Sequence, residues 1–433
     1  MLDATDTIFA VASGAGRAAV TVVRLSGPAA GPLLDRLCRR RPAPRIASLR
    51  ALRAAEGEVL DRALVLWLPG PASYTGEDSA ELHLHGGRAV LDAVTETLVS
   101  FGARPAEAGE FSRRAFVNGR LGLLEAEAVA DLVAAETQAQ RRQALRQLGG
   151  ALGALYQGWA ERLTRLLAQQ EALIDFTDED LPPETEAAML HEIATIRAGI
   201  AAHLDDGRRG ERLREGLVIA VTGAPNVGKS TLINVLAGRD VAIVSPHAGT
   251  TRDVIEARAV IGGVPVTLLD TAGLRETADP VEAEGVRRAR ARAAEADLVL
   301  VVHDGIEAGG TAMPTGTEVL VVANKADRGV AQDGADIAVS ALTGTGMAAL
   351  RARLVQEVTR LANDAGPPAL TRMRHRAGLA EAVDWLQRAG GADLPELRGE
   401  ALRAALRGIG RVTGRVGTED VLDAVFSQFC IGK

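Results

Sequence analysis

The stretch with the clearest chemistry is Gly223-Ala-Pro-Asn-Val-Gly-Lys-Ser230. It follows the apolar run Leu217–Val221 and leads into the helical pattern Thr231–Ala237. A buried strand, a glycine turn and a helix in that order surround a phosphate with backbone N–H groups. In such a P-loop, Lys229 reaches the β- and γ-phosphate oxygens and Ser230 ligates Mg²⁺. The alternative is an ordinary glycine-rich turn, and each of the motifs that follow makes it less plausible.

Four further segments follow in the order that a GTPase requires. They are Thr250-Thr-Arg-Asp253, Asp270-Thr-Ala-Gly273, Asn324-Lys-Ala-Asp327 and Ser340-Ala-Leu342. Thr251 is suited to Mg²⁺ and the γ-phosphate, Asp270 to the Mg²⁺ shell, and the Gly273 N–H to the γ-phosphate. Asp327 can accept two hydrogen bonds from guanine N1 and N2, and the last segment completes the base pocket. Five segments in this order predict a GTP site.

The usual water-orienting residue of a Ras-like GTPase is absent from this sequence. Leu274 stands where those enzymes carry glutamine. Asn226 could direct its amide oxygen to a monovalent cation against the phosphates, which would replace an arginine finger. Glu282 either positions water or only complements the dipole of its helix.

Lysine is rare in this chain. Lysine and arginine total 49 residues, yet only Lys229, Lys325 and Lys433 are lysine. We expect these positions to need a compact ammonium that a planar guanidinium cannot replace. The alternative is chance.

The length, net charge and cysteine content of the chain predict a multidomain cytoplasmic protein. A chain of 433 residues is long enough for two or three domains. A net charge of −7 argues against non-specific coating of nucleic acid. No apolar run is long enough for a bilayer, Met1–Asp6 lacks the basic start of a secretory signal, and Cys38 and Cys430 lie too far apart in sequence to suggest a disulfide framework.

The pattern along the chain predicts α/β plus α domains. Residues 1–120 alternate short strands with helices in an α+β domain, and 121–212 are helical. We expect Gly149-Gly150 and Gly153 to break or bend this helical stretch and Asp180–Pro183 to end it. A further helix is expected from about Glu184 to Leu204. Residues 213–366 read as a Ras-like P-loop GTPase domain, inserted into a discontinuous all-α helical domain that resumes over 367–433.

Two local patterns favour plain interpretations. His83 and His85 share one face of a strand, but no third zinc ligand is evident. Gly207-Arg-Arg-Gly210 is similar to the clamp of a KH module, but no KH pattern surrounds it, so we interpret it as a linker.

Taken together, the sequence resembles the MnmE (TrmE) family of tRNA-modification GTPases over nearly its whole length. Besides the GTPase segments, the matching motifs are Asp6-Thr-Ile8, Gly16-Arg17, Arg24-Leu-Ser-Gly27, Tyr74-Thr-Gly-Glu-Asp78, His85-Gly-Gly87, Gly109-Glu-Phe-Ser112, Arg114-Ala-Phe116, Glu125-Ala-Glu-Ala128 and the terminal Phe429-Cys-Ile-Gly-Lys433.

The resemblance implies a folate-binding, dimerising N-terminal domain and a potassium-activated GTPase domain. K⁺ would fall to Asn226, Ser245, His247 and Thr250, Mg²⁺ to Ser230 and Thr251, and water positioning to Glu282. The full nucleotide and ion set is Asn226, Val227, Gly228, Lys229, Ser230, Thr231, Ser245, Pro246, His247, Ala248, Gly249, Thr250, Thr251, Asp270, Thr271, Ala272, Gly273, Asn324, Lys325, Asp327, Ser340, Ala341 and Leu342.

The resemblance also implies the chemistry and the partners. A 5-formyl- or methylene-tetrahydrofolate would bind at Arg24, Glu81, Arg120 and Lys433. The family acts as a homodimer with FAD-containing MnmG (GidA), in a heterotetramer-type complex, and adds a carboxymethylaminomethyl-type group to C5 of the wobble uridine of certain tRNAs. Cys430 matches a cysteine needed for that modification; its alternative role is that of a small apolar residue.

Some positions depart from the family pattern. Arg120 stands where many members have lysine, His247 is unusual, and Gly305–Gly316 is short where relatives have a helix. Two other functions stay open at this point. One is a ribosome-assembly GTPase related to Era, and the other is a non-enzymatic folate-binding scaffold with a GTPase switch.

Overall fold

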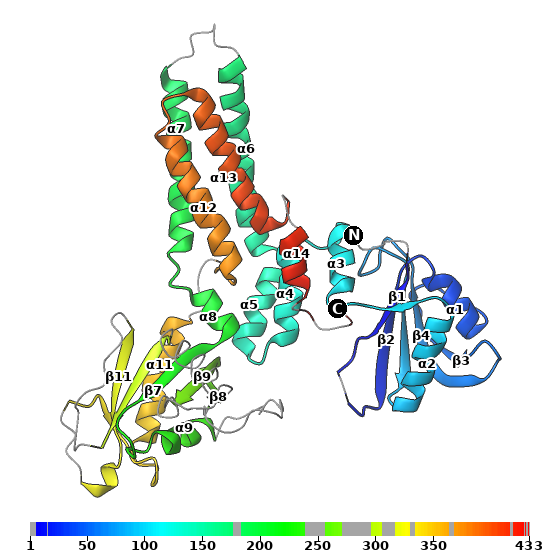
Figure 1. Cartoon of the computed structure of the whole chain (residues 1–433), viewed down its shortest axis with the longest axis horizontal. Helices are drawn as coiled ribbons and strands as arrows, with labels where there is room; N and C mark the ends of the chain where they lie inside the picture. The colour runs from blue at the N-terminus through cyan, green and yellow to red at the C-terminus, as the bar shows by residue number, and fades with distance from the viewer. Residues whose placement is uncertain are drawn as a thin grey trace, which may run out of the picture. The chain divides into compact units, whose positions relative to one another are not determined.

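The computed structural model describes residues 6–14, 16–175, 183–238, 256–270, 296–304, 317–329, 334–362, 368–415, 419–427, 429 and 432. Contacts divide the chain into two compact units (Figure 1). Unit 1 comprises Met1–Ala130, Leu148–Tyr156 and Gly410–Lys433, and unit 2 comprises Asp131–Gln147 and Gln157–Ile409.

Unit 1 contains a six-stranded sheet in the order β3-β4-β5-β2-β1-β6. Its neighbouring strands are antiparallel except for β1 and β6, which are parallel. The strands are β1 (Ile8–Val11), β2 (Val20–Ser26), β3 (Ser48–Arg53), β4 (Val59–Leu68), β5 (Ser79–His85) and β6 (Arg104–Pro105). The helices of the N-terminal part are α1 (Ala30–Cys38), α2 (Arg88–Ser100) and α3 (Glu110–Val117).

The two faces of this sheet differ because the strands alternate in polarity. Side chains such as Val23, Leu25, Leu82 and Leu84 form the core with α1 and α2. The intervening residues of β2 and β5, including Arg24 and Glu81, point to the opposite face and stay half-exposed. The Arg24–Glu81 ion pair therefore lies on the face that α1 and α2 leave uncovered.

The end of the chain joins unit 1 through apolar contacts. Helix α14 (Glu419–Phe426) packs on α3, and Phe426 and Phe429 are buried in a cluster with Leu123, the first residue of α4 (Leu123–Ala134). Gly109 allows this approach, because an added Cβ there would lie 2.5 Å from the Phe426 carbonyl oxygen.

Unit 2 contains the second sheet, in the order β12-β11-β10-β7-β9-β8. All pairs are parallel except β8 with β9. The strands are β7 (Leu217–Thr222), β8 (Glu256–Ile261), β9 (Val264–Asp270), β10 (Leu298–His303), β11 (Glu318–Ala323) and β12 (Ile337–Ala338). Helices α9 (Lys229–Ala237) and α11 (Met347–Leu361) contribute to its main core, and η2 (Ala326–Arg328) follows β11.

A bundle of long helices makes up the rest of unit 2 (Figure 1). Helix α7 packs on α12. Arg162 of α6 donates to Glu192 of α7 at 2.6 Å. Helix α13 packs closely on α6 where Gly399 faces Ile174 and Gln170. The bundle helices are α6 (Ala151–Asp175), α7 (Pro183–Leu204), α12 (Met373–Gly390) and α13 (Pro395–Thr413). Segments from before and after the nucleotide-binding sheet thus build one bundle, as the sequence predicted.

A short helix, α8 (Arg209–Glu215), leads from the bundle to β7. Arg376 of α12 bonds Asp206 at 2.7 Å and Glu211 of α8 at 3.1 Å. Arg212 of α8 bonds Asp297 at 2.7 Å, immediately before β10. Residues 207–210 thus lie where the chain passes from the bundle to β7, as expected of a linker, and residues 209–210 form the start of α8.

The first helical stretch is broken in two places. The predicted interruption at Gly149-Gly150 is confirmed as a break, because α5 (Gln138–Leu148) ends and α6 begins there, whereas α6 continues through Gly153 without a break. A second break at residues 135–137 was not predicted. The predicted end at 180–183 lies mostly outside the described residues, and the helix expected from Glu184 is confirmed as α7.

The predicted fold class is confirmed: an α+β part, a discontinuous helical part and an inserted P-loop sheet. The exact domain boundaries stay predictions. Within the described ranges, no helix is both long and apolar enough to cross a membrane.

Candidate functional site

The P-loop runs from the end of β7 to the start of α9, as the sequence predicted. Two of its residues must be glycine. Gly223 has φ +146°, and a Cβ there would lie 2.0 Å from the Val302 carbonyl oxygen of β10. Gly228 has φ +94°, and a Cβ there would lie 2.4 Å from Asn324 Nδ2. The turn therefore sits against β10 on one side and against the Asn324 segment on the other.

Both described lysines bind P-loop carbonyls. Lys229 is 4% exposed, and its Nζ donates to the carbonyl oxygens of Gly223 at 2.9 Å and Ala224 at 2.8 Å. Lys325 Nζ donates to the Asn226 carbonyl oxygen at 2.7 Å and pairs with Asp304 at 2.9 Å. These contacts agree with the expectation that a compact, multivalent donor is needed at each position.

The end of β9 brings Asp270 to the start of α9. Ser230 Oγ donates to Asp270 Oδ2 at 2.7 Å, and Asp270 is 3% exposed. A hydroxyl and a carboxylate side by side are hard oxygen ligands of the kind that Mg²⁺ prefers. The two residues therefore fit the predicted Mg²⁺ site.

The base-recognition segments meet beside the P-loop. Asn324 Nδ2 donates to the Val227 carbonyl oxygen at 2.8 Å, and its Oδ1 accepts from the Ala341 N–H at 3.0 Å. Asn324 thus ties the P-loop to the Ser340 segment. A hydrogen bond with Ser340 lowers the pKa of the exposed Asp327 carboxyl, which keeps it an acceptor. Leu342 is 82% exposed.

Several predicted site residues lie outside the described residues, and their placement stays a prediction. They are Ser245, Pro246, His247, Ala248, Gly249, Thr250, Thr251, Thr271, Ala272, Gly273, Leu274, Glu282, the Gly305–Gly316 segment, Cys430 and Lys433.

A second polar site lies on the uncovered face of the unit 1 sheet. Arg24 of β2 stands opposite Glu81 of β5 in the strand register, and its Nη2 donates to Glu81 Oε1 at 3.0 Å. The Arg24 Cζ lies 5.5 Å from the ring centre of Tyr74 and 5.9 Å from that of Phe111. The pair is half-buried, with about a quarter of each side chain exposed. A guanidinium, a carboxylate and an aromatic wall suit a flat heterocycle that carries N–H donors and carboxylates.

Arg120 and two histidines also lie in this part of unit 1. Arg120 is exposed, and its Cγ lies beside Gly76 in the loop that carries Tyr74. His85 Nδ1 pairs with Asp61 at 2.7 Å, and His83 Nε2 lies 3.5 Å from Glu81 Oε2. Within the described part of the chain, these histidines do not belong to any cluster of three or more metal-ligating residues.

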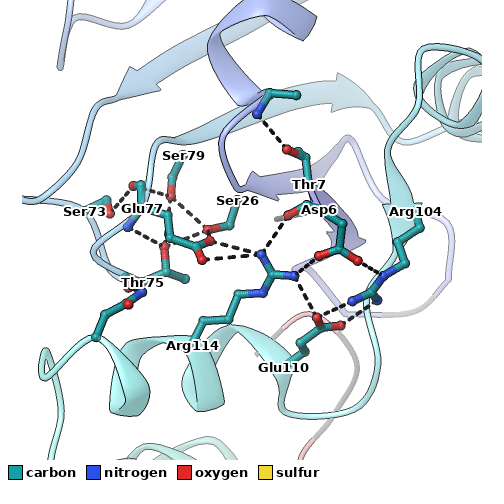
Figure 2. Close-up of polar contacts among 12 residues, drawn as sticks. Asp6, Thr7, Ser26, Ser73, Thr75, Glu77, Ser79, Arg104, Glu110 and Arg114 are labelled. Atoms are coloured by element: carbon teal, nitrogen blue, oxygen red, sulfur yellow. Dashed lines mark hydrogen bonds and ion pairs between the residues drawn. The ribbon is translucent and has the colours of Figure 1, made fainter. Parts of the chain in front are cut away.

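A buried ionic network lies beside this site (Figure 2). Arg114 of α3 is 6% exposed and contacts the carboxylates of Asp6, Glu77 and Glu110. Arg104 contacts Asp6 and Glu110 from the other side. Asp6, Glu77, Glu110 and Arg114 lie in motifs shared with the family but had no predicted role, and Arg104 and Asp304 were not predicted as site residues. Only the charges at these positions hinted at ion pairs.

The network holds its carboxylates in the charged state. Burial by itself would raise the pKa of Glu110, but hydrogen bonds from Arg104, from the Glu107 N–H and from Arg114 outweigh it. Its pKa therefore lies below the ordinary 4.5. The pKa of Asp6 is also lowered. Burial alone would raise it, but the hydrogen bonds and charges of Arg104 and Arg114 outweigh burial.

Two family profiles and several full-length relatives match this chain. The profile for the GTP-binding protein TrmE N-terminus matches residues 7–120, and that for the MnmE helical domain matches residues 123–430. The tRNA modification GTPase MnmE of Gluconacetobacter diazotrophicus is 58% identical, with 98% of each chain covered. The protein of the same name from Rhodospirillum rubrum is 56% identical, with 99% of each covered.

This chain belongs to the MnmE family of GTPases. It is therefore a GTP hydrolase, and the resemblance inferred from the motifs is confirmed. Among solved structures, a variant of Era from Aquifex aeolicus bound to GDP and aluminium fluoride is 26% identical over 41% of this chain and 69% of that chain. The TM-score of this match is 0.26.

The ionic network predicts an acid-sensitive contribution to stability. Because the folded-state pKa of Glu110 is depressed, its contribution is fully present above about pH 5.5 and is lost as the pH falls through the folded pKa. Glu110→Gln should cost about 3 kcal/mol at pH 7, because it removes one partner of a buried ion pair. Thermal melting of the full chain at pH 7 and near pH 3.5 measures this, and the loss should shrink at the lower pH.

Glu107→Gln is the matched control, because the Glu107 side chain is exposed and Glu107 contacts Glu110 through its backbone, by its N–H and its carbonyl oxygen. It should melt like the wild type at both pH values. An equal melting loss for Glu110→Gln at both pH values would contradict the assignment.

Proposed function

We propose that this chain is a potassium-activated, homodimeric GTPase that acts in tRNA modification in the cytoplasm. With an FAD-containing partner, MnmG, it adds a carboxymethylaminomethyl-type group to C5 of the wobble uridine of certain tRNAs. A tetrahydrofolate bound near Arg24 and Glu81 supplies the carbon. The observation that carries this proposal is the nucleotide site of a chain whose curated relatives, matched over nearly its full length, are named tRNA modification GTPases.

The described side chains support GTP binding of the P-loop type. Lys229 and Lys325 fix the carbonyls of the loop, which leaves its N–H groups to converge on phosphates. Ser230 and Asp270 would hold Mg²⁺, which supplies charge neutralisation at the β- and γ-phosphates. Asp327 would select guanine through its two acceptor oxygens.

Asn226 supports a role for a monovalent cation. Its backbone is left-handed, with φ +63°, and Lys325 holds its carbonyl. The residue is exposed, so its amide oxygen could ligate K⁺ beside a bound phosphate. We propose Ser245, His247, Thr250 and Thr251 as further ion ligands and Glu282 as the water-positioning residue, by resemblance to the family.

The uncovered face of the unit 1 sheet supports a homodimer. Leu49, Leu64, His83 and Val22 stand opposite one another across β3, β4, β5 and β2. Leu49 is 64% exposed and Leu64 is 45% exposed, although both are large and apolar. A row of this kind is costly to leave in water, and a second copy of the chain is the partner that we propose for it. Arg24 and Glu81 continue the same face, so the folate site would border the dimer contact.

GTP hydrolysis in matched KCl and NaCl tests the catalytic part of the proposal. K⁺ should raise the rate about 100-fold, because a cation at Asn226 stabilises charge that develops in the transition state. Asn226→Ala should abolish the difference between the salts. Asn234→Ala is the matched control, because Asn234 is an exposed residue of α9, and it should keep the difference. Equal rates of the wild type in both salts would refute potassium activation.

Light scattering of a Leu64→Arg variant tests the dimer. A charge at Leu64 should prevent burial of the apolar row, so the mass should fall to that of one 45.2 kDa chain. Val99→Arg is the control, because Val99 is 52% exposed on α2, which covers the other face of the sheet. Retention of the dimer by Leu64→Arg would exclude this face as the contact.

A further inference from the structure

The loop between β4 and β5 provides one wall of the Arg24–Glu81 site. Tyr74 lies in this loop, with its ring centre 5.5 Å from the Arg24 guanidinium carbon. Its hydroxyl lies 2.8 Å from Ser112 Oγ of α3. The position of the ring, and with it the orientation of Arg24, therefore depends on where the loop is held relative to α3.

Side chains, rather than helix or strand hydrogen bonds, hold this loop. Asn118 Nδ2 donates to the Thr75 carbonyl oxygen at 2.7 Å. Ser26 Oγ lies 2.7 Å from Thr75 Oγ1 and donates to Glu77 Oε2 at 2.7 Å. Ser26 is two residues beyond Arg24 on the same face of β2. The contacts that hold the loop therefore lie next to the partly exposed Arg24–Glu81 pair.

Arg114 connects the loop to the rest of the domain (Figure 2). Its Nη1 donates to the Asp6 carbonyl oxygen at 3.0 Å and to Glu77 Oε2 at 3.2 Å. Its Nη2 donates to Asp6 Oδ1 at 2.6 Å and to Glu110 Oε1 at 2.9 Å. One planar fork thus bonds the N-terminal segment, the loop and α3 at once. A lysine ammonium has three donors on one atom and cannot span these partners.

We propose that Arg114 is a positioning residue of the Arg24–Glu81 site. Through Glu77 it fixes the loop, and through the loop it fixes Tyr74 against Arg24. Arg114 is itself buried, and it reaches the loop through Glu77, which in turn bonds Ser26. The inference rests on the proposed function for its ligand, a tetrahydrofolate, and on the described contacts for the position of the loop.

The test uses the full chain with Arg114→Lys and Glu77→Gln, and two readouts. Hydrogen exchange of a peptide covering residues 70–78, without ligand, measures the loop. Calorimetry with 5-formyltetrahydrofolate measures the site. Both variants should exchange about tenfold faster in this peptide, and both should bind about tenfold more weakly. Glu77→Gln keeps the side-chain shape, so it tests the inference even if Arg114→Lys folds poorly.

Two controls separate positioning from general destabilisation. Arg113→Lys changes the neighbouring arginine of α3, which pairs with Asp423, and should leave both readouts unchanged. Leu34→Ala removes a fully buried side chain of α1 behind the sheet. It should lower the melting temperature but keep the ligand affinity. Equal loss of affinity in Leu34→Ala at a matched melting loss would overturn the inference.

The two readouts also separate this inference from the folate proposal. If the wild type does not bind the folate, the proposed ligand is wrong, and the exchange of residues 70–78 alone decides whether Arg114 positions the loop. Unchanged exchange in both variants would overturn the positioning role. So would unchanged folate affinity in both variants, in a wild type that binds.

Discussion

The nucleotide site depends on ammonium groups that satisfy the outward carbonyls of the P-loop. A loop whose N–H groups converge on phosphates turns its carbonyls the other way, and those carbonyls need donors of their own. Lys229 takes the carbonyls of Gly223 and Ala224, and Lys325 takes that of Asn226. The chain otherwise uses arginine almost throughout, including in the buried network of unit 1. Each of these ammonium groups thus bonds two oxygens from a single nitrogen, whereas the Arg114 guanidinium bonds its partners through two separate nitrogens.

In each site, a polar side chain joins segments that are far apart in the sequence. In unit 2, Asn324 joins the P-loop to the Ser340 segment, so base recognition and phosphate binding share one set of hydrogen bonds. Asp304 extends this set at the end of β10 by pairing with Lys325. In unit 1, Arg114 joins three segments that are up to 108 residues apart. Each unit thus has one polar residue that ties its site together, and loss of that residue should affect several segments at once.

Much of this was predictable from sequence, and the exceptions have physical reasons. Strand β5 and helix α7 follow their hydrophobic patterns closely. The break before α5 was missed, although Thr137 and Gln140 form a capping box: Thr137 Oγ1 accepts the Gln140 N–H, and Gln140 Oε1 accepts the Thr137 N–H. The spacing Thr-x-x-Gln is a capping-box signature, but strong helix formers on both sides of it favoured one continuous helix. The network around Arg114 could not be derived from local patterns, because ion-pair partners far apart in sequence are set by the tertiary fold.

The central claim is that the P-loop requires ammonium donors, and GTP affinity of a Lys325→Arg variant tests it most directly. A guanidinium at this position should not reach both the Asn226 carbonyl and Asp304, so affinity should fall about tenfold or more. Arg328→Lys, at the exposed end of η2, is the reciprocal control and should bind like the wild type. If Lys325→Arg binds GTP as tightly as the wild type, the ammonium is dispensable there, and the retention of lysine at this position needs another cause.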